Sequence, residues 1–285
     1  MKQVDNDKSL IIQTKGLVNF TKFQLRLTDK LLNKEASDWL RRAKIHLQQK
    51  DYPIAIDACN EAIDITPEDA VAYRYSAIAR MLIGDYADAL EDFRLAIQFD
   101  PNDLETYLER GFMQYDLKEF TLSIADFSKV IDLDPNHTQA YYSRGYAYYD
   151  LKDFSNAIAD FTKTIDLDMN HVEAWYNRGF ARFDIKDYRG AIADFTEAIK
   201  LNPEDINAYA NRGEARYHLK HLRGAIADFT VVIKMAPDAA NAYYNRGVSQ
   251  FELMNESAAL EDLNKARKLD HPGAQKAIDK IEKLK

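Results

Sequence analysis

The pentapeptide AIADF occurs three times in the chain, at residues 157–161, 191–195 and 225–229, and a fourth copy with one change, SIADF, occupies residues 123–127. Each copy begins 34 residues after the previous one. This period is far longer than the 3.6-residue period of a helix or the two-residue period of a strand. The sequence therefore predicts a protein built from stacked copies of one larger structural unit.

The 34-residue spacing divides most of the chain into seven repeats, at 36–69, 70–103, 104–137, 138–171, 172–205, 206–239 and 240–273. When positions 1 to 34 are counted within each repeat, position 4 is always Trp or Tyr and position 8 is always Ala or Gly. Position 20 is Ala or Ser throughout, and position 24 is Phe in five of the seven repeats. Position 32 is Pro in five repeats. Small and large residues at fixed offsets indicate that every repeat packs in the same way.

Two stretches in each repeat have the spacing of a helix face. Positions 4, 8 and 11–12 share one face, and so do positions 17, 20, 24, 27 and 28. The stretches are interrupted near position 15 by GD, KD or KE, and near positions 31–33 by proline with Asp or Asn. Each repeat is therefore predicted to be two antiparallel helices. One such pair cannot bury its apolar face alone, so the repeats must stack.

This pattern resembles that of the tetratricopeptide repeat (TPR) family, in which Trp or Tyr, Gly, Ala, Phe and Pro recur with a 34-residue period. The seven repeats cover about 238 of the 285 residues. The resemblance implies an all-α fold, a right-handed superhelical solenoid of antiparallel helix pairs whose concave face is lined by the first helix of each pair. It also implies a non-catalytic scaffold or adaptor for protein–protein interaction rather than an enzyme.

The two ends of the chain fall outside the repeats. Residues 274–285 have apolar side chains on one helix face and charged ones on the other, which predicts a C-terminal capping helix over the last repeat. Residues 1–35 contain seven Lys and Arg and four Asp and Glu, so this N-terminal segment carries a charge of +3. We expect a disordered start followed by an amphipathic helix with an apolar stripe from Phe20 to Leu31. That helix either caps the first repeat or docks as an arm in a groove of its own or a neighbouring molecule.

The composition argues against several classes of function. The net charge of −8 disfavours a nucleic-acid partner, because such a protein needs a basic face toward the phosphates. The single cysteine suits a reducing compartment, and no apolar run is long enough to cross a membrane, so we expect a cytoplasmic protein without a membrane partner. No phosphate-binding loop or nucleophile motif is present, so we expect neither enzyme activity nor a cofactor. His218 and His221 lie three residues apart with no nearby cysteine, so no metal is expected either.

An aspartate and an arginine recur with the same period, and packing does not explain them. Position 23 is Asp in every repeat except the first, and position 7 is Arg in every repeat except the second. The two exceptions, Ala58 and Ser76, face each other if each Asp pairs with the Arg of the next repeat. We therefore predict ion pairs that fix the angle and register between repeats, an alternative being arginines that bind an anionic ligand. The predicted pairs are Asp92–Arg110, Asp126–Arg144, Asp160–Arg178, Asp194–Arg212 and Asp228–Arg246.

The resemblance also places a ligand on the concave side, against positions 2, 5, 9, 12 and 13 of the first helices. In the third to fifth repeats, positions 9 and 12 are aromatic and position 13 is Asp. The predicted protein-binding groove consists of Phe112, Tyr115, Asp116, Tyr142, Tyr146, Tyr149, Asp150, Tyr176, Phe180, Phe183 and Asp184. An alternative for the aromatic residues at position 12 is that they only pack between neighbouring helices.

Aromatic anchors within a polar rim are typical of a protein-binding hot spot, and aspartates favour Lys or Arg on the partner. We therefore predict a protein or peptide partner with apolar anchors and basic residues. Family members that hold the carboxylate of a chaperone tail need Lys and Arg beside Asn, and here only the Asn residues are present, so we do not expect this mode. A second hypothesis is a self-assembling homo-oligomer that uses the N-terminal arm.

Overall fold

The computed structural model describes residues 30–283 of the chain. The predicted disordered start and most of the predicted N-terminal stripe lie outside the described residues. The first described helix covers residues 30–49 and has no interruption at residues 35 and 36, where the first repeat was predicted to begin. The first repeat therefore begins inside a longer helix.

The helices follow the 34-residue period. From the second repeat on, the first helix occupies positions 1–13 and the second helix positions 17–30, except that the second helix of the last repeat ends one position earlier. This arrangement confirms the predicted all-α fold of helix pairs. After residues 30–49, the helices are α2 (Tyr52–Ile65), α3 (Ala70–Leu82), α4 (Tyr86–Phe99), α5 (Leu104–Asp116), α6 (Phe120–Leu133), α7 (Thr138–Asp150), α8 (Phe154–Leu167), α9 (Val172–Asp184), α10 (Tyr188–Leu201), α11 (Ile206–His218), α12 (Leu222–Met235), α13 (Ala240–Glu252), α14 (Glu256–Lys268) and α15 (Ala274–Glu282).

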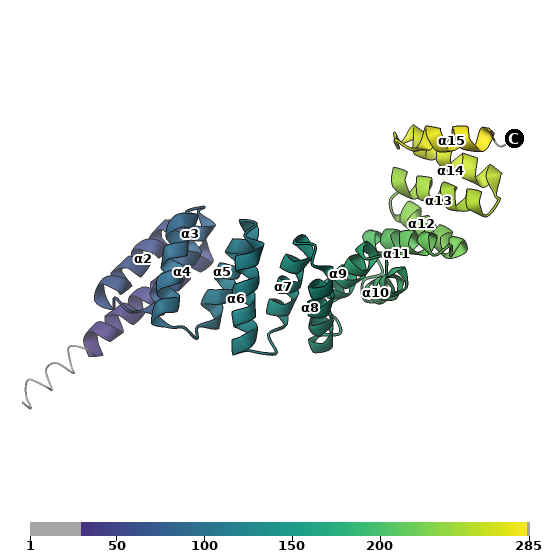
Figure 1. Cartoon of the computed structure of the whole chain (residues 1–285). Coiled ribbons are helices and arrows are strands. Elements are labelled where there is room, and N and C mark those ends of the chain that lie inside the picture. The colour runs from purple at the N-terminus through teal and green to yellow at the C-terminus, as the bar shows by residue number, and fades with distance from the viewer. Residues whose placement is uncertain (1–29, 284–285) are drawn as a thin grey trace, which may run out of the picture. The chain divides into compact units, whose positions relative to one another are not determined.

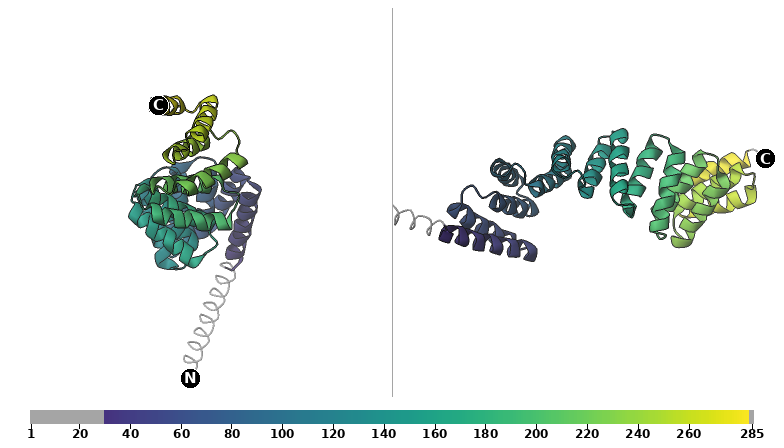
Figure 2. Two further views of the ribbon diagram at one scale, coloured as in Figure 1. Left: turned by 90° about the vertical axis from the view of Figure 1, so that its right-hand side faces the viewer. Right: turned by 90° about the horizontal axis from the view of Figure 1, so that it is seen from below.

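The chain divides into two compact blocks between Leu117 and Lys118, so that α5 belongs to the N-terminal block and α6 to the C-terminal block. In the N-terminal block α2 packs on α3, α3 on α4 and α4 on α5. In the C-terminal block every helix from α6 to α15 packs on the next one along the chain (Figures 1 and 2). First helices of neighbouring repeats also touch, α9 with α11 and α11 with α13, so they form one wall.

The core of each helix pair is built around position 24. Phe161, Phe195 and Phe229 are each at most 1% exposed. A Cβ atom placed on Gly179 would lie 3.0 Å from Cδ1 of Phe195, so position 8 must be small for the first helix to lie against this ring. The Ala or Ser residues at position 20 are completely buried. The period of small and aromatic residues is therefore a packing pattern.

The turn between the two helices has the same backbone conformation in every repeat. Position 15 has a positive φ, from 59° to 84°, and is Lys in five of the seven repeats. At Lys152 the backbone N–H donates to the carbonyl of Tyr149 at 2.8 Å, and the N–H of Asp153 donates to that of Tyr148 at 2.9 Å. These are the two bonds of a Schellman motif, which ends a helix with a left-handed residue that is usually glycine. A lysine there adopts a conformation that is strained for any residue with a Cβ atom.

We expect Lys152→Gly to raise the free energy of unfolding by about 0.5–1 kcal/mol. Glycine removes the left-handed strain, and this gain exceeds the extra chain entropy that glycine loses on folding. Asp166→Gly, on an exposed position within α8, is the matched control and should lower stability by about 0.5–1 kcal/mol, because its backbone is helical. Urea denaturation of both variants measures the difference, and a destabilised Lys152→Gly protein would contradict the assignment.

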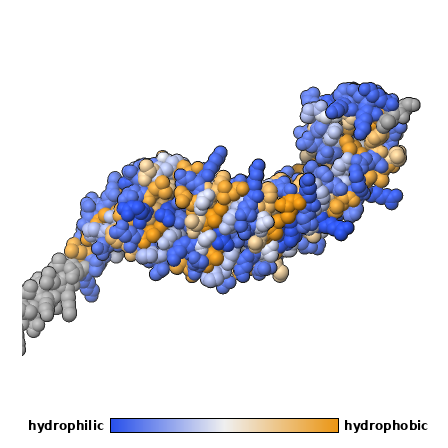
Figure 3. Space-filling view, viewed as in Figure 1, coloured by the Kyte–Doolittle hydropathy of each residue, from blue (hydrophilic) through white to orange (hydrophobic). Residues whose placement is uncertain are grey.

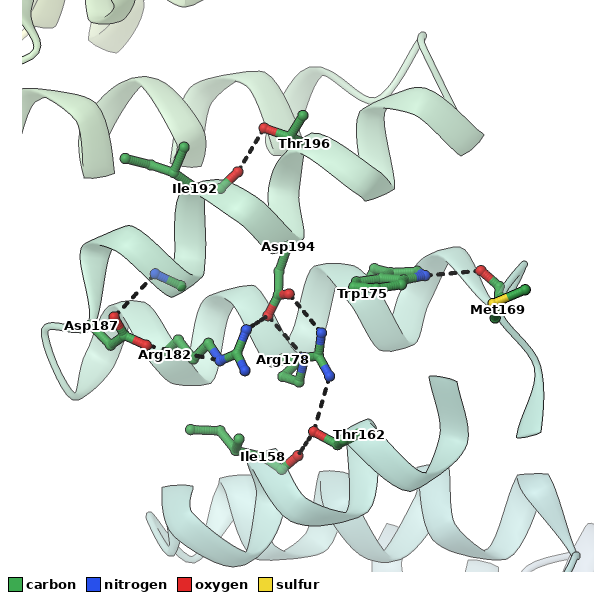
Figure 4. A network of polar contacts seen from close by, with 11 residues as sticks. Ile158, Thr162, Met169, Trp175, Arg178, Arg182, Asp187, Ile192, Asp194 and Thr196 are labelled. Atoms are coloured by element: carbon green, nitrogen blue, oxygen red, sulfur yellow. Dashed lines mark hydrogen bonds and ion pairs between the residues drawn. The ribbon is translucent and has the colours of Figure 1, made fainter. Parts of the chain in front are cut away.

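The predicted pairing of each Asp with the Arg of the next repeat is wrong, because in the fourth to seventh repeats the arginine at position 7 binds the aspartate of its own repeat. Arg178 holds Asp194 through two parallel hydrogen bonds, Nε to Oδ2 at 3.0 Å and Nη2 to Oδ1 at 2.8 Å (Figure 4). The physical reason is that positions 7 and 23 face each other where the second helix folds back along the first. The same bidentate geometry joins Arg144 to Asp160, Arg212 to Asp228 and Arg246 to Asp262.

Of the two exceptions that suggested pairing between repeats, the one in the second repeat has a substitute inside its own repeat. In the second repeat, Ser76 donates to Oδ2 of Asp92 at 2.6 Å, and Nε of Arg80 lies 2.9 Å from the same oxygen. Asp92 is thus held within its repeat and not by Arg110. In the first repeat, Arg42 lies over the ring of Trp39, 4.5 Å from the centroid. A hydroxyl and a second arginine thus replace the missing arginine of the second repeat, whereas Arg42 is exposed and makes the same kind of ring contact that Arg178 makes with Trp175.

The remaining nitrogen of each arginine makes the contact between repeats. Nη1 of Arg178 donates to the hydroxyl of Thr162 in the preceding repeat at 3.0 Å. That hydroxyl donates to the carbonyl of Ile158 at 2.7 Å, so its lone pairs are left to accept from the arginine (Figure 4). The sequence analysis did not identify the hydroxyl at position 25 as the group that accepts the hydrogen bond between repeats. The equivalent contacts are Arg144 to Ser128, Arg212 to Thr196 and Arg246 to Thr230.

We expect Arg178→Ala to destabilise the protein by about 2 kcal/mol, because it removes two hydrogen bonds from the buried carboxylate of Asp194 and leaves it the bond from Arg182 at 2.8 Å. A double-mutant cycle of Arg178→Ala with Asp194→Ala, measured by chemical denaturation, should give a coupling energy of about 1 kcal/mol or more. The cycle of Arg178→Ala with Asp160→Ala is the control and should give a smaller value, because Asp160 binds Arg144. Equal coupling in the two cycles would contradict the pairing within repeats.

Candidate functional site

The residues predicted to form the groove lie on three first helices. Those on α7 and α9 belong to the C-terminal block, where they can be followed together, whereas those on α5 belong to the N-terminal block. The three sets are Phe112, Tyr115 and Asp116 on α5, Tyr142, Tyr146, Tyr149 and Asp150 on α7, and Tyr176, Phe180, Phe183 and Asp184 on α9.

A cavity of about 150 Å³ lies between α7, α8 and α9. Four of its lining residues were predicted from the sequence, whereas Phe161, a core residue, and Asn177 were not. Tyr146 is 37% exposed, so this cavity is reached from solvent along its ring. Mostly apolar walls with a few polar groups are typical of a binding pocket. The lining consists of Tyr146, Tyr149, Phe161, Tyr176, Asn177 and Phe180.

Ring contacts join the two first helices around this cavity. Within α7, the ring centroids of Tyr142 and Tyr146 are 5.6 Å apart. Within α9, the rings of Tyr176 and Phe180 stack with centroids 6.2 Å apart. Between the helices, Tyr149 and Phe180 are 6.0 Å apart. The wall of the cavity is therefore one aromatic cluster that spans the fourth and fifth repeats.

Phe183 was predicted to belong to the groove, but it does not line this cavity. Its ring centroid is 5.3 Å from that of Tyr188 on α10 and 5.7 Å from that of His218 on α11. It therefore packs between helices, as the alternative for position 12 anticipated, whereas Tyr149 at the same position of the preceding repeat lines the cavity.

Asparagines at position 6 fix the tyrosines of the preceding repeat. Nδ2 of Asn177 donates to the hydroxyl of Tyr142 at 3.0 Å, and Nδ2 of Asn211 donates to that of Tyr176 at 2.8 Å. Burial raises the pKa of both tyrosines. Sequence reasoning treated these asparagines only as possible members of a carboxylate clamp. The signal for their actual role is Tyr at position 5 followed 35 residues later by Asn.

The acidic residues at position 13 accept hydrogen bonds from tyrosines of the preceding repeat. The hydroxyl of Tyr149 donates to Oδ2 of Asp184 at 2.5 Å, and that of Tyr217 donates to Oε1 of Glu252 at 2.6 Å. Burial, with the bond to Glu252, raises the pKa of Tyr217 to about 12. Lys220 also reaches Oε2 of Glu252 at 2.6 Å, and the two bonds lower the pKa of this carboxyl. The hydroxyl of Tyr149 is neutral, so its bond brings no positive charge to Asp184 at the edge of the groove.

The last repeat has a second cavity, of about 270 Å³, between α13, α14 and α15. Val248, Phe251 and Leu263 line it at positions 9, 12 and 24, which in the first cavity are aromatic. The helix α15, predicted to cap the last repeat, buries Ile278 and Ile281 against this core. It takes the place that the first helix of a further repeat would have.

His271 lies beside this second cavity. Its ring stacks on Tyr244 with centroids 4.0 Å apart, and its Nδ1 accepts the N–H of Gly273 at 3.1 Å. Burial lowers the pKa of His271. The unfolded chain, in which this histidine has its ordinary pKa, then binds the proton more readily than the folded protein, so protonation favours unfolding.

We expect the free energy of unfolding to fall as the pH decreases from about 6.5, the ordinary pKa of histidine, toward the lower pKa of folded His271. His271→Asn should reduce this fall, because an amide can still accept the N–H of Gly273 but does not titrate. Chemical denaturation of both proteins across this pH range measures the effect. An unchanged pH dependence in the variant would contradict a contribution from His271.

Two other features are absent from the part of the chain that the structure describes. Residues 30–283 contain no group of three or more His, Cys, Asp or Glu side chains placed to hold a metal ion. None of the described helices has the length and apolar character that crossing a membrane requires.

Family models of the tetratricopeptide repeat match most of the chain. The matched residues are 40–103, 138–170, 172–205 and 221–274, and a further TPR repeat model matches residues 113–152. The chain belongs to the tetratricopeptide repeat family. No curated protein matches it in sequence.

Solved structures of TPR proteins share this fold. YrrB, a TPR protein with an unusual peptide-binding site, is 26% identical, and the match covers 66% of this chain and 97% of YrrB with a TM-score of 0.61. MamA is also 26% identical, over 60% of this chain and 94% of MamA, with a TM-score of 0.57. A tetratricopeptide repeat protein from Parabacteroides merdae covers 88% of this chain and 98% of its own, with a TM-score of 0.59, and at 19% identity it supports the fold alone.

Proposed function

We propose that this protein is a non-catalytic scaffold or adaptor that binds a peptide segment of a partner protein. The segment places an apolar side chain in the cavity between α7, α8 and α9 and basic side chains near Asp150 and Asp184. The cavity is the observation that carries this proposal, because it lies on the face formed by the first helices and is lined almost entirely by rings.

The size and lining of the cavity suit an apolar anchor. An engineered apolar cavity of about 150 Å³ in another protein binds benzene, so a cavity of this volume has room for one aliphatic or aromatic side chain. Three polar groups at its wall are already hydrogen-bonded, Tyr149 to Asp184, Tyr176 to Asn211 and Asn177 to Tyr142. Burying a polar group without a hydrogen-bond partner is costly. An apolar anchor avoids this cost, because these three groups keep the partners that they already have.

The charge at the edge of the cavity favours a basic partner. Asp150 and Asp184 are exposed and lie at position 13 of neighbouring first helices. Asp116 has the same position on α5, which extends the acidic pattern in the sequence. Carboxylates placed in this way accelerate the approach of Lys and Arg and disfavour acidic segments. The peptide-binding site of YrrB, at 26% identity, supports a peptide as the ligand class.

Selection from a random peptide library displayed on phage, with the full chain as bait, tests this function. We expect the selected peptides to share a bulky apolar residue with Lys or Arg nearby. Tyr146→Ala combined with Phe180→Ala should weaken their binding by more than about 2 kcal/mol, close to 30-fold, because anchors in such a cluster carry most of the interface energy. Fluorescence anisotropy of a labelled selected peptide measures the change.

Asp166→Ala, on the exposed face of α8, is the control for this experiment and should leave the affinity unchanged. Circular dichroism should show that the helix content of all variants is the same. If a folded Tyr146→Ala, Phe180→Ala protein binds the selected peptides as well as wild type, the binding site is elsewhere. A selection of acidic peptides that bind this cavity would contradict the predicted charge of the partner.

A second candidate function is self-assembly through the N-terminal segment. Residues 1–35 carry +3 in a chain of −8, so the charge of this segment complements an acidic groove. Sedimentation equilibrium of the full chain, and of a chain lacking residues 1–29, distinguishes the two candidates. A concentration-dependent dimer that is lost on deletion supports self-assembly, whereas a monomer at all concentrations contradicts it.

A further inference from the structure

The cavity at the C-terminal end differs in charge from the cavity between α7, α8 and α9. Its apolar wall comes from Tyr244, Val248 and Phe251 on α13 and Leu263 on α14. On the opposite side it is lined by Lys276 and Lys280 of α15, and no carboxylate lines it. Figure 3 shows apolar residues among hydrophilic ones over these helices. The same positions of the repeat thus line an apolar pocket in both cavities. The charged edge is acidic at the cavity between α7, α8 and α9 and basic at the cavity between α13, α14 and α15.

Both lysines are available to a ligand. They are exposed, and neither is paired with a carboxylate within residues 30–283. Two acidic side chains of α13 and α15 are engaged with other residues: Glu252 binds Lys220 and Tyr217, and Asp279 accepts a bond from Gln275 at 2.7 Å. Lys280 adds to the lowering of the pKa of Glu252 but makes no hydrogen bond to it. The ammonium groups therefore remain without a partner of opposite charge in direct contact.

The positive charge at this pocket comes from the two lysines of α15. The helices α13 to α15 with their connections, residues 240–282, contain six Lys and Arg and seven Asp and Glu, so the positive charge is local to the edge of the pocket. Two lysines without a carboxylate in direct contact, beside an apolar wall, favour an acidic partner at this pocket. The N-terminal segment of the chain, at +3, has the wrong charge for this pocket. The occupant indicated by charge is therefore a different protein with an acidic surface.

The spacing of the two lysines indicates the form of that partner. Lys276 and Lys280 are four residues apart on α15, so they lie on one face of the helix about one turn from each other. Carboxylates four residues apart on a partner helix have the same spacing. An amphipathic helix that carries them beside a bulky apolar residue matches both the basic edge and the apolar wall.

We propose that the pocket between α13, α14 and α15 binds an acidic amphipathic helix of a partner protein. The helix inserts an apolar side chain against Tyr244, Val248 and Phe251 and places carboxylates one turn apart against Lys276 and Lys280. This site is separate from the cavity between α7, α8 and α9, and its partner has the opposite charge.

The test uses two synthetic peptides of roughly 15 residues, acetylated and amidated, with leucines on one helix face and either Glu or Lys on the other. Binding to the full chain is measured by fluorescence anisotropy, and the site is located by NMR chemical shifts. We expect the Glu peptide to bind and to shift amides of α13, α14 and α15. Lys276→Glu combined with Lys280→Glu should weaken this binding about tenfold or more. The Lys peptide should not shift these amides.

A matched control separates a specific site from overall charge. Lys265→Glu combined with Lys268→Glu makes the same charge change on exposed residues of α14 that do not line the pocket, and should alter the affinity by less than about threefold. Circular dichroism checks that both variants keep their helices. An equal loss of affinity in the two variants would overturn the proposal, as would a Glu peptide that fails to bind.

The groove variant keeps this inference distinct from the proposed function. Tyr146→Ala combined with Phe180→Ala should leave the binding of the Glu peptide unchanged. If that variant abolishes the binding, the acidic peptide uses the cavity between α7, α8 and α9, and the pocket at α15 is not a separate site. Failure of the library selection does not affect this outcome, because the synthetic peptides are used directly.

Discussion

The guanidinium group at position 7 is the constraint on which the stacked repeats of the C-terminal block depend. In the fifth repeat, Arg178 holds Asp194 of its own second helix through two bonds and reaches Thr162 of the preceding repeat with its third nitrogen. One planar group thus closes a helix pair and sets its register against its neighbour. Arginine is suited to this role because its donors point in fixed directions, whereas the single ammonium of lysine could not serve both partners in this geometry.

The tripeptide Asn-Arg-Gly at 177–179 shows how this constraint builds the groove. Asn177 binds the tyrosine of the preceding first helix, Arg178 binds the threonine of the preceding second helix, and Gly179 lets Phe195 lie against the backbone. Both helices of one repeat are therefore tied to the next repeat by adjacent residues. The rings around the first cavity keep their positions because the same residues fix the helices that carry them. The tripeptide recurs at 211–213 and 245–247.

The sequence was sufficient to predict the features that follow from the 34-residue period. It did not predict the contacts in which one kind of interaction replaces another. The 34-residue spacing was sufficient for the helix pairs, because small and aromatic residues at fixed offsets leave few ways to pack. The pairing of Arg with Asp was wrong, because the argument assumed that a missing partner leaves a gap in the ladder. In the structure Ser76 and Arg80 hold Asp92 in place of an arginine at position 7, and Arg42 is exposed and lies over Trp39. Matching each Asp at position 23 with one Arg at position 7 in the sequence cannot reveal that a different residue binds the Asp.

The candidate site was predicted in part, for a related reason. The tyrosines at positions 5 and 9 were found because large aromatic residues on a first helix are conspicuous. Asn177 and Thr162 were missed because a polar residue on a helix has many possible partners, and only the path of the neighbouring repeat selects one. Phe183 shows the converse, since its residue type fits the groove but its ring packs on Tyr188. Residue type alone does not separate these cases.

Native-state hydrogen exchange of the full chain carrying Thr162→Val tests the central claim most directly. Valine has nearly the shape of threonine but cannot accept the hydrogen bond from Arg178, so the variant removes the contact between two repeats with little change in packing. If this contact couples the repeats, opening free energies in α9 should fall by about 1 kcal/mol, while those in α13 stay unchanged. Unchanged protection in α9 would contradict the claim that arginine at position 7 sets the register between repeats.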